Sequence, residues 1–301
     1  MKLVINWHIT EACNYECFYC FAKWHKKNQK ELLHSKEKVR QLMHEISLLP
    51  AILNVKNGTA FTGIRLNLVG GETFLYKQQV LNIIQEARKH GFELSAITNG
   101  SSLDQDLITV IATQFSTIGF SIDSLSDKSN LEIGRSFKNT PIKKDKILKY
   151  INEIRSISPN IDIKINSVIN QINKDEDLTD FIKKVSPSKW KVFKMLPVIT
   201  NQHMIDDFEF YNFLKKHDEL QPIISSEDND EMTHSYLMID PIGRFFQNSS
   251  TSCVETSISN TSTPANFLNS TPLPSITGLD ASGPMFPKPS TAVPLLTTAT
   301  K

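Results

Sequence analysis

Segments with the pattern of buried strands alternate with segments of helical pattern, and this alternation limits the possible folds more than any other feature. Strands are predicted at 3–9, 64–69, 93–98, 117–123, 161–169 and 190–196, and helices at 31–49, 77–90, 103–114, 143–157, 175–185 and 206–217. Such repeats build parallel strands joined by right-handed crossovers. The expected fold class is α/β, a partial (βα)6 TIM-like barrel, with its chemistry at the carboxyl ends of the strands.

The last 53 residues differ sharply from the rest. Residues 249–301 contain 10 Ser, 10 Thr and 7 Pro, and few of them are apolar in any periodic pattern. A segment of this composition cannot bury enough surface to offset the entropy of ordering it. We therefore predict a catalytic domain at 1–248, closed by a hairpin at 235–247 around Pro241, and a disordered C-terminal tail at 249–301.

Charge and hydropathy exclude two classes of protein. With 33 basic and 32 acidic residues the net charge is +1, which gives no broad basic face for nucleic acid. No run of about 18 apolar residues occurs, so no membrane span is expected. The N-terminus lacks the apolar core of a signal peptide, which indicates the cytoplasm.

Three of the four cysteines lie within eight residues. Cys13, Cys17 and Cys20 form a Cys-x3-Cys-x2-Cys pattern directly after the first predicted strand, whereas Cys253 lies in the tail. Such a loop can hold three irons of an iron–sulfur cube and leave the fourth iron open. Zinc is the alternative, with His8 or His25 as a fourth ligand, in a zinc-stabilised binding module. The position at a strand's carboxyl end favours the cluster.

Polar motifs follow the next strands in the same phase. They are Gly70-Gly71-Glu72 after the second strand, Asn99 and Ser101 after the third, Ser121 at the end of the fourth, and Arg135 beyond it. Each motif alone has an ordinary explanation as a turn, a helix cap or a solvated arginine. Their order, one strand end after another, favours a shared site.

The cysteine pattern and the Gly-Gly-Glu motif resemble the signature of the radical S-adenosylmethionine (SAM) superfamily. The resemblance implies a barrel of the radical SAM type and a [4Fe–4S] cluster bound by Cys13, Cys17 and Cys20. It also implies SAM on the open iron, and its cleavage by one electron to a 5′-deoxyadenosyl radical that abstracts hydrogen from a substrate. Gly70, Gly71 and Glu72 would lie near the methionine amino group.

Four further segments resemble the viperin family, and particularly its microbial members, from residue 3 to about residue 248. These are 6–10, 164–170, 189–193, and the pair 235–237 and 244–246. The resemblance implies a dehydratase of antiviral defence that abstracts the 4′ hydrogen of a ribonucleoside triphosphate, CTP or else GTP or UTP. Loss of the 3′ hydroxyl and reduction would give the 3′-deoxy-3′,4′-didehydro nucleotide, a chain terminator for viral polymerases. A flavodoxin- or ferredoxin-like electron donor is implied as a partner.

The same resemblance implies two sets of contact residues. Positions near SAM are Ser101, Ser121, Arg135 and Asn166, and positions near the triphosphate or sugar are Asn6, Arg65, Asn99, Lys164, Lys189 and Lys191. Several cations suit a triphosphate, and strand alternation puts Lys189 and Lys191 on one face. No Walker-type glycine loop is present, so these cations would have to bind the phosphates alone.

The chain departs from the animal members in several places. Arg65 stands in place of a lysine, Lys189 in place of an arginine, and Val69 in place of a serine that contacts phosphate. The Ser/Thr/Pro tail replaces an ordered segment that closes over the nucleotide, and the amphipathic N-terminal helix for membranes is missing. The alternative within the superfamily is an enzyme acting on another phosphorylated nucleoside or on a peptide.

Overall fold

A computed structural model describes residues 1–20, 30–197, 199–227 and 237–246. The predicted boundary of the tail, Cys253 and His25 all lie outside these ranges. The strands are β1 (Lys2–His8), β2 (Gly63–Val69), β3 (Glu93–Thr98), β4 (Thr117–Ser121), β5 (Asp162–Ile169), β6 (Lys189–Lys194), β7 (Ile224–Glu227), β8 (Leu237–Ile239) and β9 (Phe245–Phe246).

The helices lie between these strands along the chain. The α-helices are α1 (Lys36–Ser47), α2 (Leu49–Asn57), α3 (Lys77–Lys89), α4 (Gln105–Gln114), α5 (Asp127–Ile133), α6 (Lys144–Ile157), α7 (Thr179–Val185) and α8 (Asp207–Lys216). Two 3-10 helices, η1 (Leu32–His34) and η2 (Asp218–Ile223), complete the described elements. No helix within the described ranges has the length and hydrophobicity that crossing a bilayer requires.

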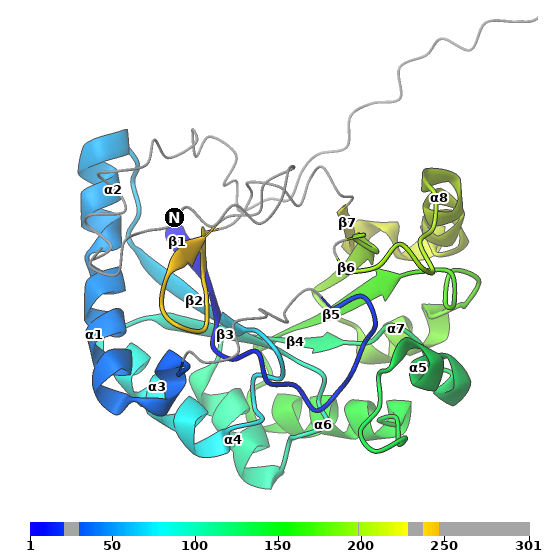
Figure 1. The fold of residues 1–301 in the computed structure, drawn as a ribbon, viewed down its shortest axis with the longest axis horizontal. Helices are drawn as coiled ribbons and strands as arrows, with labels where there is room; N and C mark the ends of the chain where they lie inside the picture. The colour runs from blue at the N-terminus through cyan, green and yellow to red at the C-terminus, as the bar shows by residue number, and fades with distance from the viewer. Residues whose placement is uncertain (21–29, 198, 228–236, 247–301) are drawn as a thin grey trace, which may run out of the picture.

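The nine strands form one sheet in the order β7-β6-β5-β4-β3-β2-β1-β8-β9. Neighbouring strands are parallel except β8 and β9, which form the predicted hairpin. The sheet curves without closing, and helices such as α1, α3, α4 and α6 line its outer side (Figure 1). The predicted partial α/β barrel is therefore confirmed, as a half-barrel.

The two faces of the sheet differ in polarity. On β1, Leu3, Ile5 and Trp7 point to the helices and are at most 1% exposed. The same apolar alternation runs through β2, β5 and β6, and it fills the core between sheet and helices. Residues of the opposite phase face the concave side, where most of them are polar and half-buried. A polar interior surface of this kind is available for a ligand.

Four details of the predicted elements were wrong or missing. The helix predicted at 31–49 is η1 followed by α1, and Pro50 opens α2, because a proline is tolerated in the first turn, where its missing N–H is not needed. The helix predicted from 175 begins only at Thr179. The short elements α5 and β7 gave no periodic signal long enough to predict.

Candidate active site

The cysteine loop, residues 10–20, follows β1 and crosses the carboxyl ends of the neighbouring strands (dark blue in Figure 1). At its start, the N–H groups of Gly71 and Glu72 donate to the carbonyls of Thr10 and Ala12, at 2.7 and 2.9 Å. Further along, the N–H of Glu16 donates to the carbonyl of Gly134 at 3.0 Å, just beyond α5. The loop is therefore attached by backbone hydrogen bonds to the ends of two distant segments.

Glycines make this close attachment possible. A Cβ on Gly71 would lie 2.1 Å from the Ala12 carbonyl oxygen, and a Cβ on Gly134 would lie 2.4 Å from that of Glu16. Gly70, with φ +131°, would meet the Thr10 oxygen at 2.5 Å. No side chain fits at these three positions without moving the loop. The side of Gly70 and Gly71 on which a Cβ would stand thus faces the cysteine loop. Their contact with the methionine amino group of SAM stays a prediction.

The three thiols are partly buried and electrostatically coupled. Burial raises the pKa of Cys13, and it raises the pKa of Cys17 to about 12 although Arg135 opposes the shift. The Tyr15 N–H points at the Cys13 sulfur, 3.3 Å away. Iron binding would therefore have to displace protons from the thiols of Cys13 and Cys17. The Tyr15 N–H would then stabilise the Cys13 thiolate.

The donor set suits a cube better than a single ion. Within the described ranges, no three His, Cys, Asp or Glu side chains converge as ligands of one metal ion. A cubane cluster binds each thiolate to a different iron, so its ligands need not converge on one point. Three soft sulfur donors on one glycine-backed loop fit such a cluster. Burial lowers the pKa of His8, the suggested zinc ligand, to about 4.

Glu72 is buried at the end of β2 and ties it to β3. Its carboxylate accepts from the Thr98 hydroxyl at 2.5 Å and from the Asn99 N–H at 2.8 Å. Burial nevertheless raises the pKa of Glu72 above its ordinary value, because the hydrogen bonds offset the desolvation only in part. A further cationic donor, such as an ammonium, would stabilise the ionised form.

Asn99 and Ser101 join the cysteine loop through Asn14. The amide of Asn14 donates to the Ser101 hydroxyl at 2.7 Å and accepts from the Asn99 amide at 3.0 Å. The Asn99 amide also lies 3.9 Å from the Cys13 sulfur. The structure therefore places Asn99, predicted as a nucleotide contact, beside the cysteines. Its contact with nucleotide stays a prediction.

Arg135 lies at the centre of a buried charged network. Its guanidinium pairs with Asp123 at 3.3 Å and donates to the Ser121 carbonyl at 2.5 Å, and it lies 3.9 Å from the Cys17 sulfur. The Tyr19 hydroxyl donates to Asp123 and lies 3.3 Å from Arg135. Arg135 is thus held by Asp123 and Tyr19, two residues that the sequence analysis did not single out.

Four cations gather on the concave face at the other side of the site. They are Arg65 on β2, Lys164 on β5, and Lys189 and Lys191 on β6. The strand register pairs Lys164 with Lys189 and Asn166 with Lys191, so the three lysines and Asn166 point to the same face of the sheet. The pKa of Lys164 is lowered by burial first and then by the charges of Arg65, Lys189 and Lys191. The predicted grouping of Lys189 and Lys191 on one face is confirmed, and Arg65 and Lys164 lie close enough to interact with them.

Acidic and amide side chains complete this concave face. Arg65 donates to Glu93 at 2.6 Å, and Glu93 also accepts from Lys2. On the next polar row, Asn67 donates to Asn6 at 2.8 Å and accepts from Ser95 at 3.0 Å. Asn67, Ser95 and Glu93 were missed, although Asn67 lies two residues after Arg65, and Glu93 pairs with Arg65 in the strand register.

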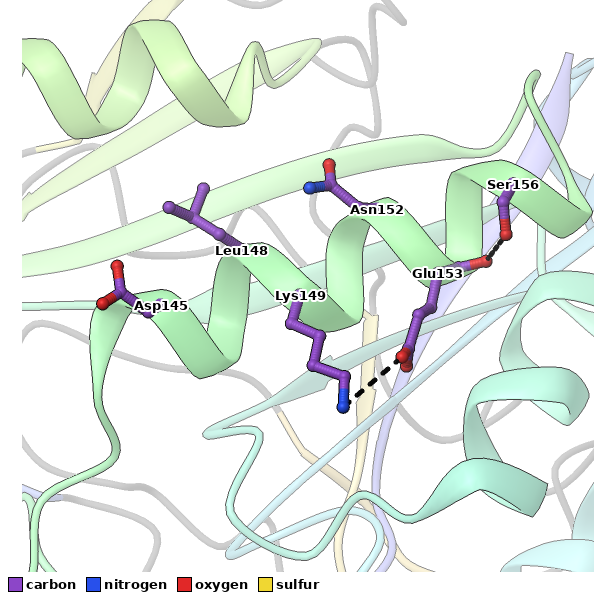
Figure 2. A pocket seen from close by; sticks show the side chains of 6 residues that line it. All are labelled: Asp145, Leu148, Lys149, Asn152, Glu153 and Ser156. Carbon is purple, nitrogen blue, oxygen red and sulfur yellow. Dashed lines mark hydrogen bonds and ion pairs between the residues drawn. The ribbon is translucent and has the colours of Figure 1, made fainter.

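A surface hollow lies away from these residues. It follows the outer face of α6 and is lined by residues of that helix alone, among them Leu148, Lys149 and Glu153 (Figure 2). Lys149 and Glu153 form an exposed ion pair across it at 3.7 Å. A groove on one helix has no second wall to enclose a ligand, so we do not assign the site there.

Comparisons with known proteins agree with this geometry. The family model described as the radical SAM superfamily matches residues 7–185. A protein of Psychrobacter lutiphocae named "S-adenosylmethionine-dependent nucleotide dehydratase" is 53% identical over 248 residues, which cover 82% of this chain and 83% of that protein. A Fibrobacter protein of the same name is 37% identical over 268 residues, covering 82% and 78%. The Oncorhynchus mykiss protein named "S-adenosylmethionine-dependent nucleotide dehydratase RSAD2" is 28% identical, covering 80% and 68%.

Solved structures share the fold at low sequence identity. A structure described as "Native anSMEcpe with bound AdoMet" has a TM-score of 0.58 at 15% identity, covering 82% of this chain and 74% of that one. Streptococcus suis SuiB bound to precursor peptide SuiA has a TM-score of 0.59 at 16% identity, covering 81% and 58%. At these identities the likeness concerns the fold alone.

Proposed function

Because this chain belongs to the radical SAM superfamily, and within it to the S-adenosylmethionine-dependent nucleotide dehydratases, we propose that its substrate is a ribonucleoside triphosphate. The candidates are CTP, GTP and UTP, and the product is the 3′-deoxy-3′,4′-didehydro analogue. Such a product lacks the 3′ hydroxyl that a polymerase extends, so it terminates chains in antiviral defence. The large pool of triphosphates in the cytoplasm favours that compartment for the reaction.

The observation that carries the proposal is the group of cations on the concave face. Burial is the first cause that lowers the pKa of Lys164, and the positive charges of Arg65, Lys189 and Lys191 lower it further, although Asp162 opposes them. A triphosphate carries about four negative charges and would relieve the repulsion with charge-assisted hydrogen bonds. Glu93 holds Arg65 at the edge of this group, and Asn6 lies on the neighbouring polar row.

The family uses a [4Fe–4S] cluster and SAM, and the cysteine loop fits the cluster. In our proposal Cys13, Cys17 and Cys20 bind it, and Gly70, Gly71, Glu72, Ser101, Ser121, Arg135 and Asn166 lie around SAM. When bound, the two groups supply one-electron cleavage of SAM and abstraction of a hydrogen atom. The chain's own residues hold the cysteine loop in place, exclude water and position the 4′ carbon of the nucleotide beside the bound SAM.

The reaction balances with two electrons and one proton. One electron would serve to cleave bound SAM, and abstraction of the 4′ hydrogen would then give 5′-deoxyadenosine. The 3′ hydroxyl leaves with the proton as water, and the second electron completes the 3′,4′ double bond. A one-electron donor is therefore needed, and we propose a carrier of the flavodoxin or ferredoxin type.

The test is anaerobic incubation of the reconstituted protein with SAM, dithionite and each ribonucleoside triphosphate in turn. We expect one of CTP, GTP or UTP to raise 5′-deoxyadenosine release and to yield a nucleotide lighter by one water in the mass spectrum. The Cys20→Ala variant, which lacks a cluster ligand, should show neither. If no triphosphate raises release above SAM alone, the proposed substrate class is wrong.

A further inference from the structure

A lysine-rich surface follows directly after the buried Arg135. Residues 136–149 contain five lysines and one aspartate, a net charge of +4 in a chain whose total charge is +1. We call the five residues the lysine surface: Lys138, Lys143, Lys144, Lys146 and Lys149. All five are exposed. So strong a local excess of positive charge is not explained by folding, because it adds repulsion between neighbours.

This surface is continuous with the cysteine loop. The residues just before it hold that loop, since the carbonyls of Ile133 and Gly134 accept from the N–H groups of Phe18 and Glu16 at 3.1 and 3.0 Å. Arg135, the next residue, lies 3.9 Å from the Cys17 sulfur. Lys138, the first residue of the lysine surface, therefore lies only three positions after Arg135.

A narrow cavity connects the same two regions. Its walls include Tyr15 of the cysteine loop, the buried Arg135, and Lys144 of the lysine surface. Its small size suits no substrate, but it shows that Lys144 lines the same space as Tyr15 of the cysteine loop. A molecule seated beside Lys144 would therefore be close to that loop.

Carboxylates neutralise only part of the positive charge on this surface. Lys143 pairs with Asp127 and Lys149 with Glu153. Lys138 lies over the Phe137 ring, at 5.3 Å, and Lys146 over the Tyr150 ring, at 5.6 Å. Ring contacts leave the charge in place. Phe137 is 47% exposed, and it adds an aromatic anchor of the kind that protein interfaces favour.

We propose that the lysine surface is the docking site of an acidic one-electron carrier protein, of the flavodoxin or ferredoxin type. The inference rests on the proposed function, which requires such a carrier. In each encounter one electron passes from the carrier, which is oxidised, to the iron–sulfur group held by the three cysteines, which is reduced. No atom is transferred. Positive charge beside the loop both steers an acidic partner and seats it where the electron must enter.

Binding of an acidic flavodoxin to the full chain tests the proposal without turnover. We compare Lys138→Glu/Lys146→Glu with Lys36→Glu/Lys38→Glu, a control with the same charge change on exposed lysines of α1. At low ionic strength we expect calorimetry to give at least about ten-fold weaker binding for the first variant and little change for the control. The difference should shrink at about 0.5 M salt, where charges are screened beyond a few ångström. Equal binding by the two variants would overturn the proposal.

Reduction kinetics separate this inference from the proposed function. With reduced flavodoxin as donor, cluster bleaching should be at least about ten-fold slower in Lys138→Glu/Lys146→Glu than in the control. With dithionite, which needs no docking, both variants should react like the parent chain. Slow bleaching with both donors would show damage to the cluster and would overturn the docking site. If flavodoxin reduces the parent chain through this surface but no triphosphate is consumed, the proposed substrate is wrong and the docking site stands.

Discussion

The two halves of the site are built in opposite ways. In the cysteine half, the loop is closed by backbone hydrogen bonds against glycines, and charges such as Arg135 and Asp123 are buried together. In the cation half, Lys164 faces other positive charges that lower its pKa. The first half is organised by contacts within the chain, whereas in the second half burial and cationic neighbours disfavour the charged form of Lys164. A cofactor that stays bound and a substrate that exchanges therefore call for different electrostatic environments.

The largest effect should come from breaking the organised half. Gly71→Ala places a Cβ only 2.1 Å from the Ala12 carbonyl oxygen, which is too close for contact, so the cysteine loop must move. A displacement of this order costs about 100-fold in rate. We expect 5′-deoxyadenosine release to fall by at least that factor, with less iron bound per chain. Gly63→Ala is the matched control, because a Cβ there meets nothing within 4 Å. Normal iron content in Gly71→Ala would show that the loop does not need this contact.

The second prediction tests the strain in the cation half. Lys164→Met removes a charge that its neighbours repel, so we expect the nucleotide KM to rise about ten-fold or more while the melting temperature without nucleotide does not fall. The control is Lys174→Met, which removes a lysine paired with Glu209 outside the site. A lower melting temperature for Lys164→Met than for this control would contradict the strain.

The same residue gives a pH dependence. Because the folded pKa of Lys164 lies below its ordinary value, the unfolded chain binds more protons in the window between the two. Stability contributed by this group therefore rises as the pH climbs from the folded pKa toward about 10.4. Lys164→Met should lack this rise, and parallel urea titrations of the two proteins at increasing pH would measure the difference.

A smaller effect is expected at Glu93, which accepts hydrogen bonds from Lys2 on β1, Arg65 on β2 and Ser116. Burial raises its pKa, but hydrogen bonds from Lys2, Ser116 and Arg65 outweigh that and lower the pKa to about 2 from 4.5. Glu93→Gln should therefore lose about 1 kcal/mol of unfolding free energy near neutral pH. The loss should disappear as the pH falls from 4.5 toward 2, because the parent carboxylate is then protonated as well. A difference that persisted at pH 2 would rule out an ionic cause.

The smallest effect is expected on the outer face of α6. Glu153→Gln removes an exposed ion pair with Lys149 in the surface hollow of Figure 2. Such pairs contribute at most about 1 kcal/mol and often nothing measurable. We expect unchanged melting temperature and unchanged dithionite-driven activity. A large loss of activity would mean that this hollow, rather than the concave face, belongs to the site.

Much of the fold could be predicted because periodicity is a local property. The six long strands were found from alternating or continuous apolar residues, and the hairpin from the turn at Pro241. Short elements escaped for the same reason, since α5 and β7 are too short to show a period. Pro50 was wrongly taken as the end of a helix, because a proline can either follow a helix or stand in the first turn of the next one, as it does in α2.

The site residues divide in the same manner. The spacing of the cysteines singled them out, and the resemblance to the viperin family singled out the lysines of β5 and β6. Asp123, Tyr19 and Asn14 could not, because each acts through a partner far away in the chain: Tyr19 meets Asp123, and Asn14 meets Ser101, more than 80 residues on. Glu93 resembled an ordinary strand-end charge until register placed it beside Arg65.

The order of strands and helices, the thiol spacing and the supply of cations follow from residues close together in the chain, so they could be predicted. The support of the cysteine loop by Gly70, Gly71 and Gly134, and the pairing of Arg135 with Asp123, became visible only in the folded chain. The same holds for the surface rich in lysine that adjoins that loop. Contacts between distant segments depend on how the sheet curves and how its crossovers end, and no local pattern of residues encodes that geometry.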